Sequence, residues 1–212
     1  MELNLFGKRR EDGADRPVRV NQLDELLVSQ GLPPYASMTL RGNGWTCITE
    51  SPFDPVAAVP TTVAELEIYN NTNDQALIVA DLFAFELLAT DADQTYGLWA
   101  MVTTSKAAPS LTALELFSLS GKAPITPTAA GTIVTGAGTT IVANGWRPYG
   151  TPRAWGNAAA TPGDGWSAPV DGKLVVPPKC SLCVAVAGSI ATAAAFHCGA
   201  TFYIEKINTT FY

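Results

Sequence analysis

The residues best suited to chemistry in this chain of 212 residues are its four cysteines and its single histidine. Cys180 and Cys183 form a C-x-x-C pair, and the adjacent His197 and Cys198 follow further along the chain. Three thiolates and an imidazole form a ligand set that tetrahedral zinc accepts. The flanking residues, however, are apolar strand formers rather than the tight turn of a zinc knuckle. We therefore expect buried packing residues here, and no metal or other cofactor.

The cysteines also bear on the compartment and on disulfides. Lys8-Arg9-Arg10 is not followed by an apolar segment, so we expect no signal peptide. Thiols of a protein that stays in the cytosol remain reduced. A disulfide between Cys183 and Cys198 would require these two residues to lie on neighbouring strands.

Catalytic arrangements are scarce in the sequence. The one histidine would have to serve every proton transfer, and no G-x-S-x-G elbow is present. Glu65 and Glu67 alternate on one predicted strand, so they share a face, as a glycosidase pair might. Alternating carboxylates on a strand are more simply its solvated face. The sequence therefore predicts that the chain is not an enzyme.

Four aromatic side chains gather in a stretch rich in Gly and Pro, residues 146–169, that we expect to be a long loop. They are Trp146, Tyr149, Trp155 and Trp166. Trp and Tyr are enriched at protein interfaces, and their faces also stack on sugar rings. The predicted role is a partner or glycan surface. The alternative is a local mini-core that closes one end of the domain.

Composition limits the kinds of partner. Charged residues make up 15% of the chain, below the roughly 25% of typical soluble proteins, and the net charge is −6. Nucleic-acid binding needs a basic face, and the basic residues near the start are mixed with acidic ones. No run of about eighteen apolar residues could span a membrane. We expect no nucleic acid and no membrane among the partners, but a surface that faces another protein.

The first third of the chain predicts an extended N-terminal arm, residues 1–60. Within it, residues 21–31 have the pattern of a short helix, capped by Asn21 and ended by Gly31. A helix this short is stable only when its apolar stripe docks on something. We expect the arm to bind a partner through the following residues: Phe6, Arg9, Arg10, Leu23, Leu26 and Leu27.

Residues 61–212 predict an antiparallel β-sandwich. Many short β-branched runs are separated by Gly, Pro and Asn, at the spacing typical of sandwiches. Residues 76–89 suit either a strand or a buried helix, and the flanking turn residues favour the strand. Residues 181–187 are apolar or small on both faces, which indicates a strand buried between two layers. The predicted class is an all-β, jelly-roll-like sandwich with an extended N-terminal arm and one short helix.

The C-terminal segment resembles the closing strands of jelly-roll virion proteins of tailed bacteriophages. The likeness rests on the Pro-Pro turn within residues 173–180, and on the aromatic-x-Glu pattern that closes residues 195–205. It implies a structural cement or decoration protein of the phage head, assembled in the host cytoplasm. The implied partners are the major capsid protein and further copies of the chain, as a trimer. The alternative function is a carbohydrate- or receptor-binding module of a phage fibre.

Overall fold

The fold is that of a computed structural model, which describes residues 6–8, 15–17, 35–88, 94–104, 114–122, 133–136, 139–140, 145–155, 165–188 and 194–207. The chain divides into two units, residues 1–34 and 35–212. In the first, β1 (Phe6–Lys8) pairs antiparallel with β2 (Asp15–Pro17). The helix expected at residues 21–31 lies outside the described residues.

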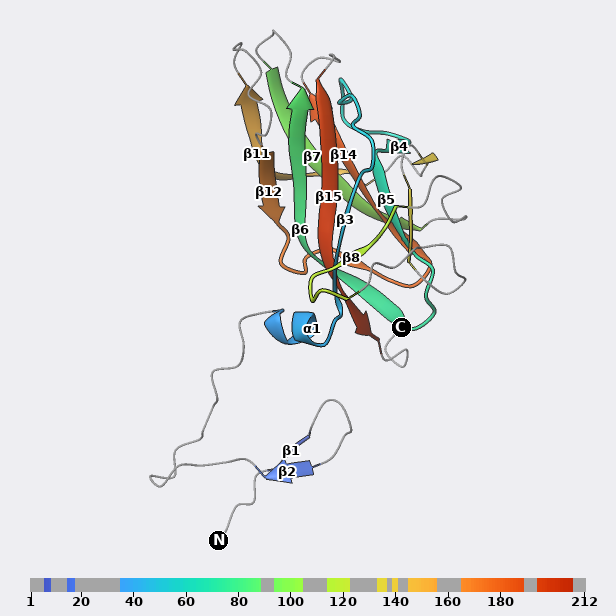
Figure 1. Cartoon of the computed structure of the whole chain (residues 1–212). Coiled ribbons are helices and arrows are strands. Elements are labelled where there is room, and N and C mark those ends of the chain that lie inside the picture. Colours follow the sequence, from blue (N-terminus) through green and yellow to red (C-terminus); the bar gives the residue numbers. More distant parts are fainter. Residues whose placement is uncertain are drawn as a thin grey trace. The chain divides into compact units, whose positions relative to one another are not determined.

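The second unit consists of two antiparallel sheets packed face to face (Figure 1). The six-stranded sheet has the order β12-β6-β15-β3-β8, with β13 also on β6, and the five-stranded sheet has the order β11-β7-β14-β5-β9. A short ribbon, β4-β10, pairs with neither sheet, and Ala64 of β4 packs against the five-stranded one. The elements are α1 (Ala36–Leu40), β3 (Gly44–Ile48), β4 (Val63–Ala64), β5 (Leu66–Asn70), β6 (Gln75–Leu88), β7 (Gln94–Thr104), β8 (Phe117–Ser118), β9 (Ile133–Gly136), β10 (Thr139–Thr140), β11 (Arg147–Trp155), β12 (Gly165–Pro169), β13 (Val175–Val176), β14 (Cys180–Gly188) and β15 (Ala195–Lys206).

The strand pairing is that of a jelly roll. Going inward from the two ends of this unit, β3 pairs with β15, β5 with β14, β6 with β12, and β7 with β11. These nested antiparallel pairs alternate between the two sheets, as they do when one long hairpin wraps around itself. The predicted jelly-roll-like sandwich is confirmed.

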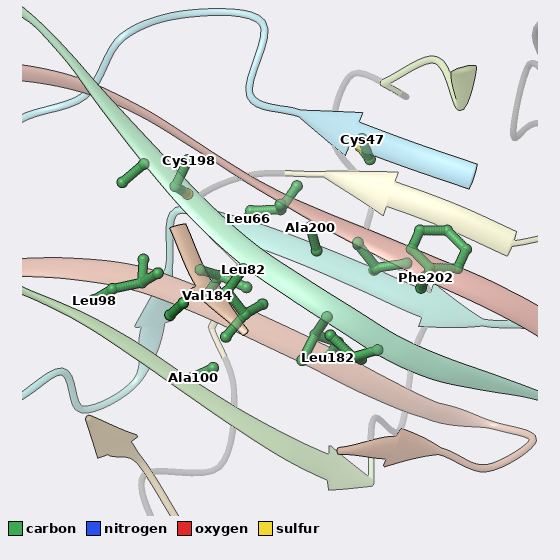
Figure 2. Close-up of a cluster of buried hydrophobic side chains, with 14 of the residues drawn as sticks. Cys47, Leu66, Leu82, Leu98, Ala100, Leu182, Val184, Cys198, Ala200 and Phe202 are labelled. Carbon is green, nitrogen blue, oxygen red and sulfur yellow. The ribbon is translucent and has the colours of Figure 1, made fainter. Parts of the chain in front are cut away.

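Strand alternation builds the core between the sheets. In β14, Leu182, Val184 and Val186 point inward and are fully buried, as expected from their period of two. They meet Leu82, Ala200 and Phe202 of the other sheet, and Figure 2 shows side chains of both sheets filling the space between the ribbons. The residues between them in β14 are buried too, which confirms the prediction of a strand covered on both faces.

Residues 35–60 belong to the sandwich unit, although the sequence analysis assigned them to the arm. β3 pairs with β15 inside the six-stranded sheet, and Phe53 then bridges to Phe196. Three residues later, Val56 bridges to Ala187 in the other sheet. This irregular segment fastens the two sheets together along one side. Its prolines hide the pairing from any pattern of alternation.

The long apolar stretch at residues 76–89 is a strand, as favoured. β6 spans Gln75–Leu88, and a bulge at Ala80 shifts its register against β15. The turn before it is held by the buried amide of Asn70, which donates to the carbonyls of Gln75 (2.8 Å) and Val176 (3.0 Å). Among the described residues, no helix is long and apolar enough to cross a membrane.

Candidate functional site

The cysteines and the histidine that suggested zinc lie in separate parts of the sandwich. Cys198 is in the core between the sheets, whereas Cys183 lies on the outer side of the five-stranded sheet, in a second apolar cluster with Met101 and Trp146. β14 and β15 belong to different sheets, so Cys183 and Cys198 are not on neighbouring strands as the disulfide would require. The four cysteines carry thiols. Within the described part of the chain, no three His, Cys, Asp or Glu side chains gather as a metal site.

Burial keeps the thiols of Cys198 and Cys183 in their neutral form. It raises the pKa of Cys198 well above its usual value, and the nearby Glu65 and Cys47 raise that pKa further. Burial also raises the pKa of Cys183, with a contribution from the charge of Glu67. Thiolate is the reactive species of cysteine, so both residues serve as apolar packing groups at neutral pH.

His197 has a positioning role in the sheet. Its Nδ1 donates to the carbonyl oxygen of Thr49 at 2.7 Å. The hydroxyl oxygen of Thr49 accepts a hydrogen bond from the backbone N–H of Cys198 at 3.2 Å. These bonds hold the chain beside β15 at the point where β3 has ended, so the histidine fastens the segment that crosses to the other sheet.

The two glutamates expected on a solvated strand face have different surroundings. Glu67 is completely buried, and its Oε1 accepts a hydrogen bond from the Ser181 hydroxyl at 2.5 Å. Its Oε2 has no hydrogen-bond partner among the described residues. The prediction of a wet face is therefore wrong for Glu67, because β14 and β9 flank it and a second apolar cluster lies on the same side of the sheet.

Glu65 lies half-buried between β4 and β5, where its backbone N–H donates to the carbonyl oxygen of Val184. Burial, followed by the negative charge of Asp54, raises the pKa of its carboxyl from 4.5 to about 7. The folded protein thus holds a proton on Glu65 that the unfolded chain releases between pH 4.5 and pH 7. The stabilising effect of that proton is complete below pH 4.5 and is lost as the pH rises to about 7.

We therefore expect Glu65→Gln to stabilise the protein at pH 8, because the amide stays neutral. After discounting for the partial exposure of the side chain, the gain should be about 1–2 kcal/mol at pH 8 and about zero at pH 4. Urea unfolding of both proteins across this pH range measures the difference. Equal pH profiles for the two proteins would contradict this assignment, and Glu115→Gln, a change at an exposed glutamate, is the matched control.

The aromatic segment is not one long loop. Residues 147–155 form β11 and residues 165–169 form β12. Trp146 is buried in the second cluster with its Nε1 donating to the carbonyl of Thr61 at 3.0 Å, and Trp166 is buried in the main core against Phe196. Both tryptophans are therefore packing residues, as in the mini-core alternative, and not parts of an exposed partner or glycan surface.

The other members of the predicted surfaces can be followed only in part. Tyr149 is half-buried and packs against the main core. The side chain of Trp155 is not described, and neither are the side chains of the arm residues predicted to bind a partner. Those arm residues are Phe6, Arg9, Arg10, Leu23, Leu26 and Leu27.

The structure reveals an apolar surface that the sequence analysis missed, on the outer side of the six-stranded sheet. In β6, Leu82 and Ala84 point into the core, so Phe83 and Phe85 point outward. Beside them, Ile48 and Phe117 are 40% and 45% exposed. We call the following residues the outer face: Ile48, Phe83, Phe85, Leu87, Phe117 and Leu119. The signal available in the sequence was a strand, residues 82–88, with apolar residues on both faces.

Register brings these residues together from distant parts of the chain. Phe83 lies opposite Gly199, which in turn lies opposite Ile48. Phe117 lies opposite Thr46 on the edge strand β8. Figure 1 shows the strands concerned, β6, β15, β3 and β8, side by side. An apolar sheet face of this kind binds other apolar surface, and its side chains offer no group for covalent or acid–base chemistry.

Comparisons of the chain with family models, curated proteins and solved structures find no match.

Proposed function

We propose that this chain is a structural protein that acts by binding other proteins through apolar surface, and that it serves as a cement protein of a tailed-bacteriophage head. The observation that carries the proposal is the outer face. Soluble monomers rarely leave several large apolar side chains together on a sheet unless a partner covers them. The proposed partners are the major capsid protein, met by the N-terminal arm, and further copies of this chain.

Three features support this proposal over a catalytic one. The jelly-roll topology agrees with the resemblance of the closing strands to phage virion proteins. Cys183, Cys198 and Glu67, which suggested chemistry, are completely buried. The low share of charged residues suits a protein whose surface is partly covered by others. On a shell, many weak contacts repeated by symmetry add up to strong attachment.

Removal of residues 1–34 tests the role proposed for the arm in binding. This deletion ends at the boundary of the sandwich unit, which has its own core, so the remaining chain should fold. We expect the full chain to co-sediment with heads of the phage that encodes it, and the shortened chain to stay in solution. Circular dichroism of the shortened chain is the folding control. Equal co-sedimentation of the two chains would remove the arm from the proposal, and absence of the full chain from the head fraction would overturn it.

A further inference from the structure

We infer that two copies of this chain associate face to face through the outer face of the six-stranded sheet. The inference rests on the proposed function only in treating this face as a protein-binding surface, and it names the occupant. The trimer implied by the resemblance would use a different geometry, since three-fold symmetry places unlike surfaces against one another. Four features of the face favour a pair related by a two-fold axis.

The first feature is the layout of the face in rows across the strands. Its side chains stand in rows set by the strand register, and the ring of Phe83 lies across Gly199, where an added Cβ would be only 2.2 Å from the ring. The absence of a side chain at Gly199 thus lets the aromatic ring lie low over the neighbouring strand. The rows are Phe85–His197, then Phe83–Gly199–Ile48, then Asp81–Thr201–Thr46–Phe117.

The second feature is the low charge of these rows. Among their nine residues, Asp81 is the one Asp, Glu, Lys or Arg. A two-fold axis brings a surface against its own copy, so like charges near the axis would oppose each other. The row that holds Phe83, Gly199 and Ile48 contains no such charge. Such a row can lie against its own copy without opposing like charges.

The third feature is the exposed apolar area of the face. Four of its side chains are 39–45% exposed and the two others are half-buried, so at about 200 Å² for each fully exposed side chain the face presents roughly 400 Å² of apolar surface. A standard-size interface takes about 800 Å² from each partner, of which slightly more than half is apolar. The face therefore supplies about the apolar area that one side of a stable dimer needs. Two such sheets can pack about 10 Å apart with their side chains interleaved.

The fourth feature is the boundary of the face, which is covered at one end by residues of the same chain. At one end, the ring of Tyr35 stacks on Tyr203 with centroids 4.8 Å apart, and the Thr39 hydroxyl donates to Tyr203 at 3.2 Å. This contact seats α1 over Gly44 and Tyr203, where the sheet is thereby covered within the chain. The remaining surface around Ile48 and Phe83 is left exposed or half-buried by the described residues. The described residues thus leave this part of the face to a second copy.

The test is the mass of the full chain in solution, measured by light scattering over a wide range of concentration. We expect a species of twice the 22.3 kDa chain mass. Ile48→Lys places a charge in the middle of the paired faces, and we expect it to weaken the association at least about 100-fold, giving monomers. Val59→Lys is the matched control, because Val59 is 54% exposed but lies outside the face, and it should leave the dimer intact.

Each other outcome overturns the inference. A monomeric or trimeric wild-type protein would do so, and so would a dimer that Ile48→Lys leaves unchanged in mass. Thermal unfolding of Ile48→Lys and Val59→Lys checks that both variants are folded. A second face variant, Phe117→Lys, must behave like Ile48→Lys.

Co-sedimentation with phage heads separates this inference from the proposed function. If the wild-type protein is a monomer and Ile48→Lys abolishes head binding, the face is occupied by the shell and not by a second copy. If Ile48→Lys separates a dimer that never binds heads, the face-to-face pair stands and the cement function is overturned.

Discussion

Phe196→Ala is expected to destabilise the sandwich by about 3–5 kcal/mol, the range found for removal of a fully buried aromatic side chain. Phe196 is completely buried between the sheets. Its ring meets the edge of Tyr96 at a centroid distance of 4.7 Å and that of Trp166 at 6.0 Å. These side chains come from β15, β7 and β12, so one ring links three strands of both sheets. Alanine would leave a cavity that rigid strands cannot fill.

Urea unfolding at constant pH measures this loss. The matched control is Phe117→Ala, the same substitution at a phenylalanine that is 45% exposed, for which we expect less than about 1 kcal/mol in the monomer. A difference of under about 1 kcal/mol between the two variants would contradict the central place given to Phe196. Measurements with monomeric protein, in the Ile48→Lys background, keep self-association out of the comparison.

The sequence predicted the strands of the sandwich well because strand alternation and turn residues are local patterns. The alternation of Leu182, Val184 and Val186 with small residues depends only on the two-residue period of a strand. The same holds for the strand at residues 76–89, which is bounded by turn residues at both ends. Pairing between strands far apart in the chain cannot be obtained in this way. The nested order of the jelly roll came instead from the resemblance of the closing strands.

The predictions for individual residues failed where burial depends on distant neighbours. Glu67 alternates with Leu66 and Ile68 as an exposed glutamate would, yet Ser181, on another strand, donates to its carboxylate in the interior. Trp146 and Trp166 stand among glycines and prolines typical of loops, and they are buried against residues from other strands. The outer face was missed for the same reason, since Ile48, Phe83 and Phe117 become neighbours only through strand register.

Gly199→Ala is expected to be among the most damaging changes of a single methyl group. A Cβ at this position would lie 2.2 Å from Cζ of Phe83 and 2.5 Å from the backbone carbonyl oxygen of Cys47. The ring can turn away, but the carbonyl belongs to β3, which is paired to β15 at this point. The two strands must separate locally, so we expect a loss of about 1–3 kcal/mol, as for an overpacked site.

The control for this substitution is Gly97→Ala in β7, where the nearest atom to the added Cβ is the side-chain Nε1 of Trp99 at 3.3 Å. A flexible side chain can give way, and alanine lowers the entropy of the unfolded chain, so the change should be within about 1 kcal/mol of neutral. The double variant Gly199→Ala, Phe83→Leu locates the strain in the first variant. We expect only partial recovery, because the contact with the Cys47 carbonyl remains when the ring is gone. A single variant Gly199→Ala as stable as the wild type would show that the sheet can open here without cost, and that Phe83 does not need the glycine in order to lie flat.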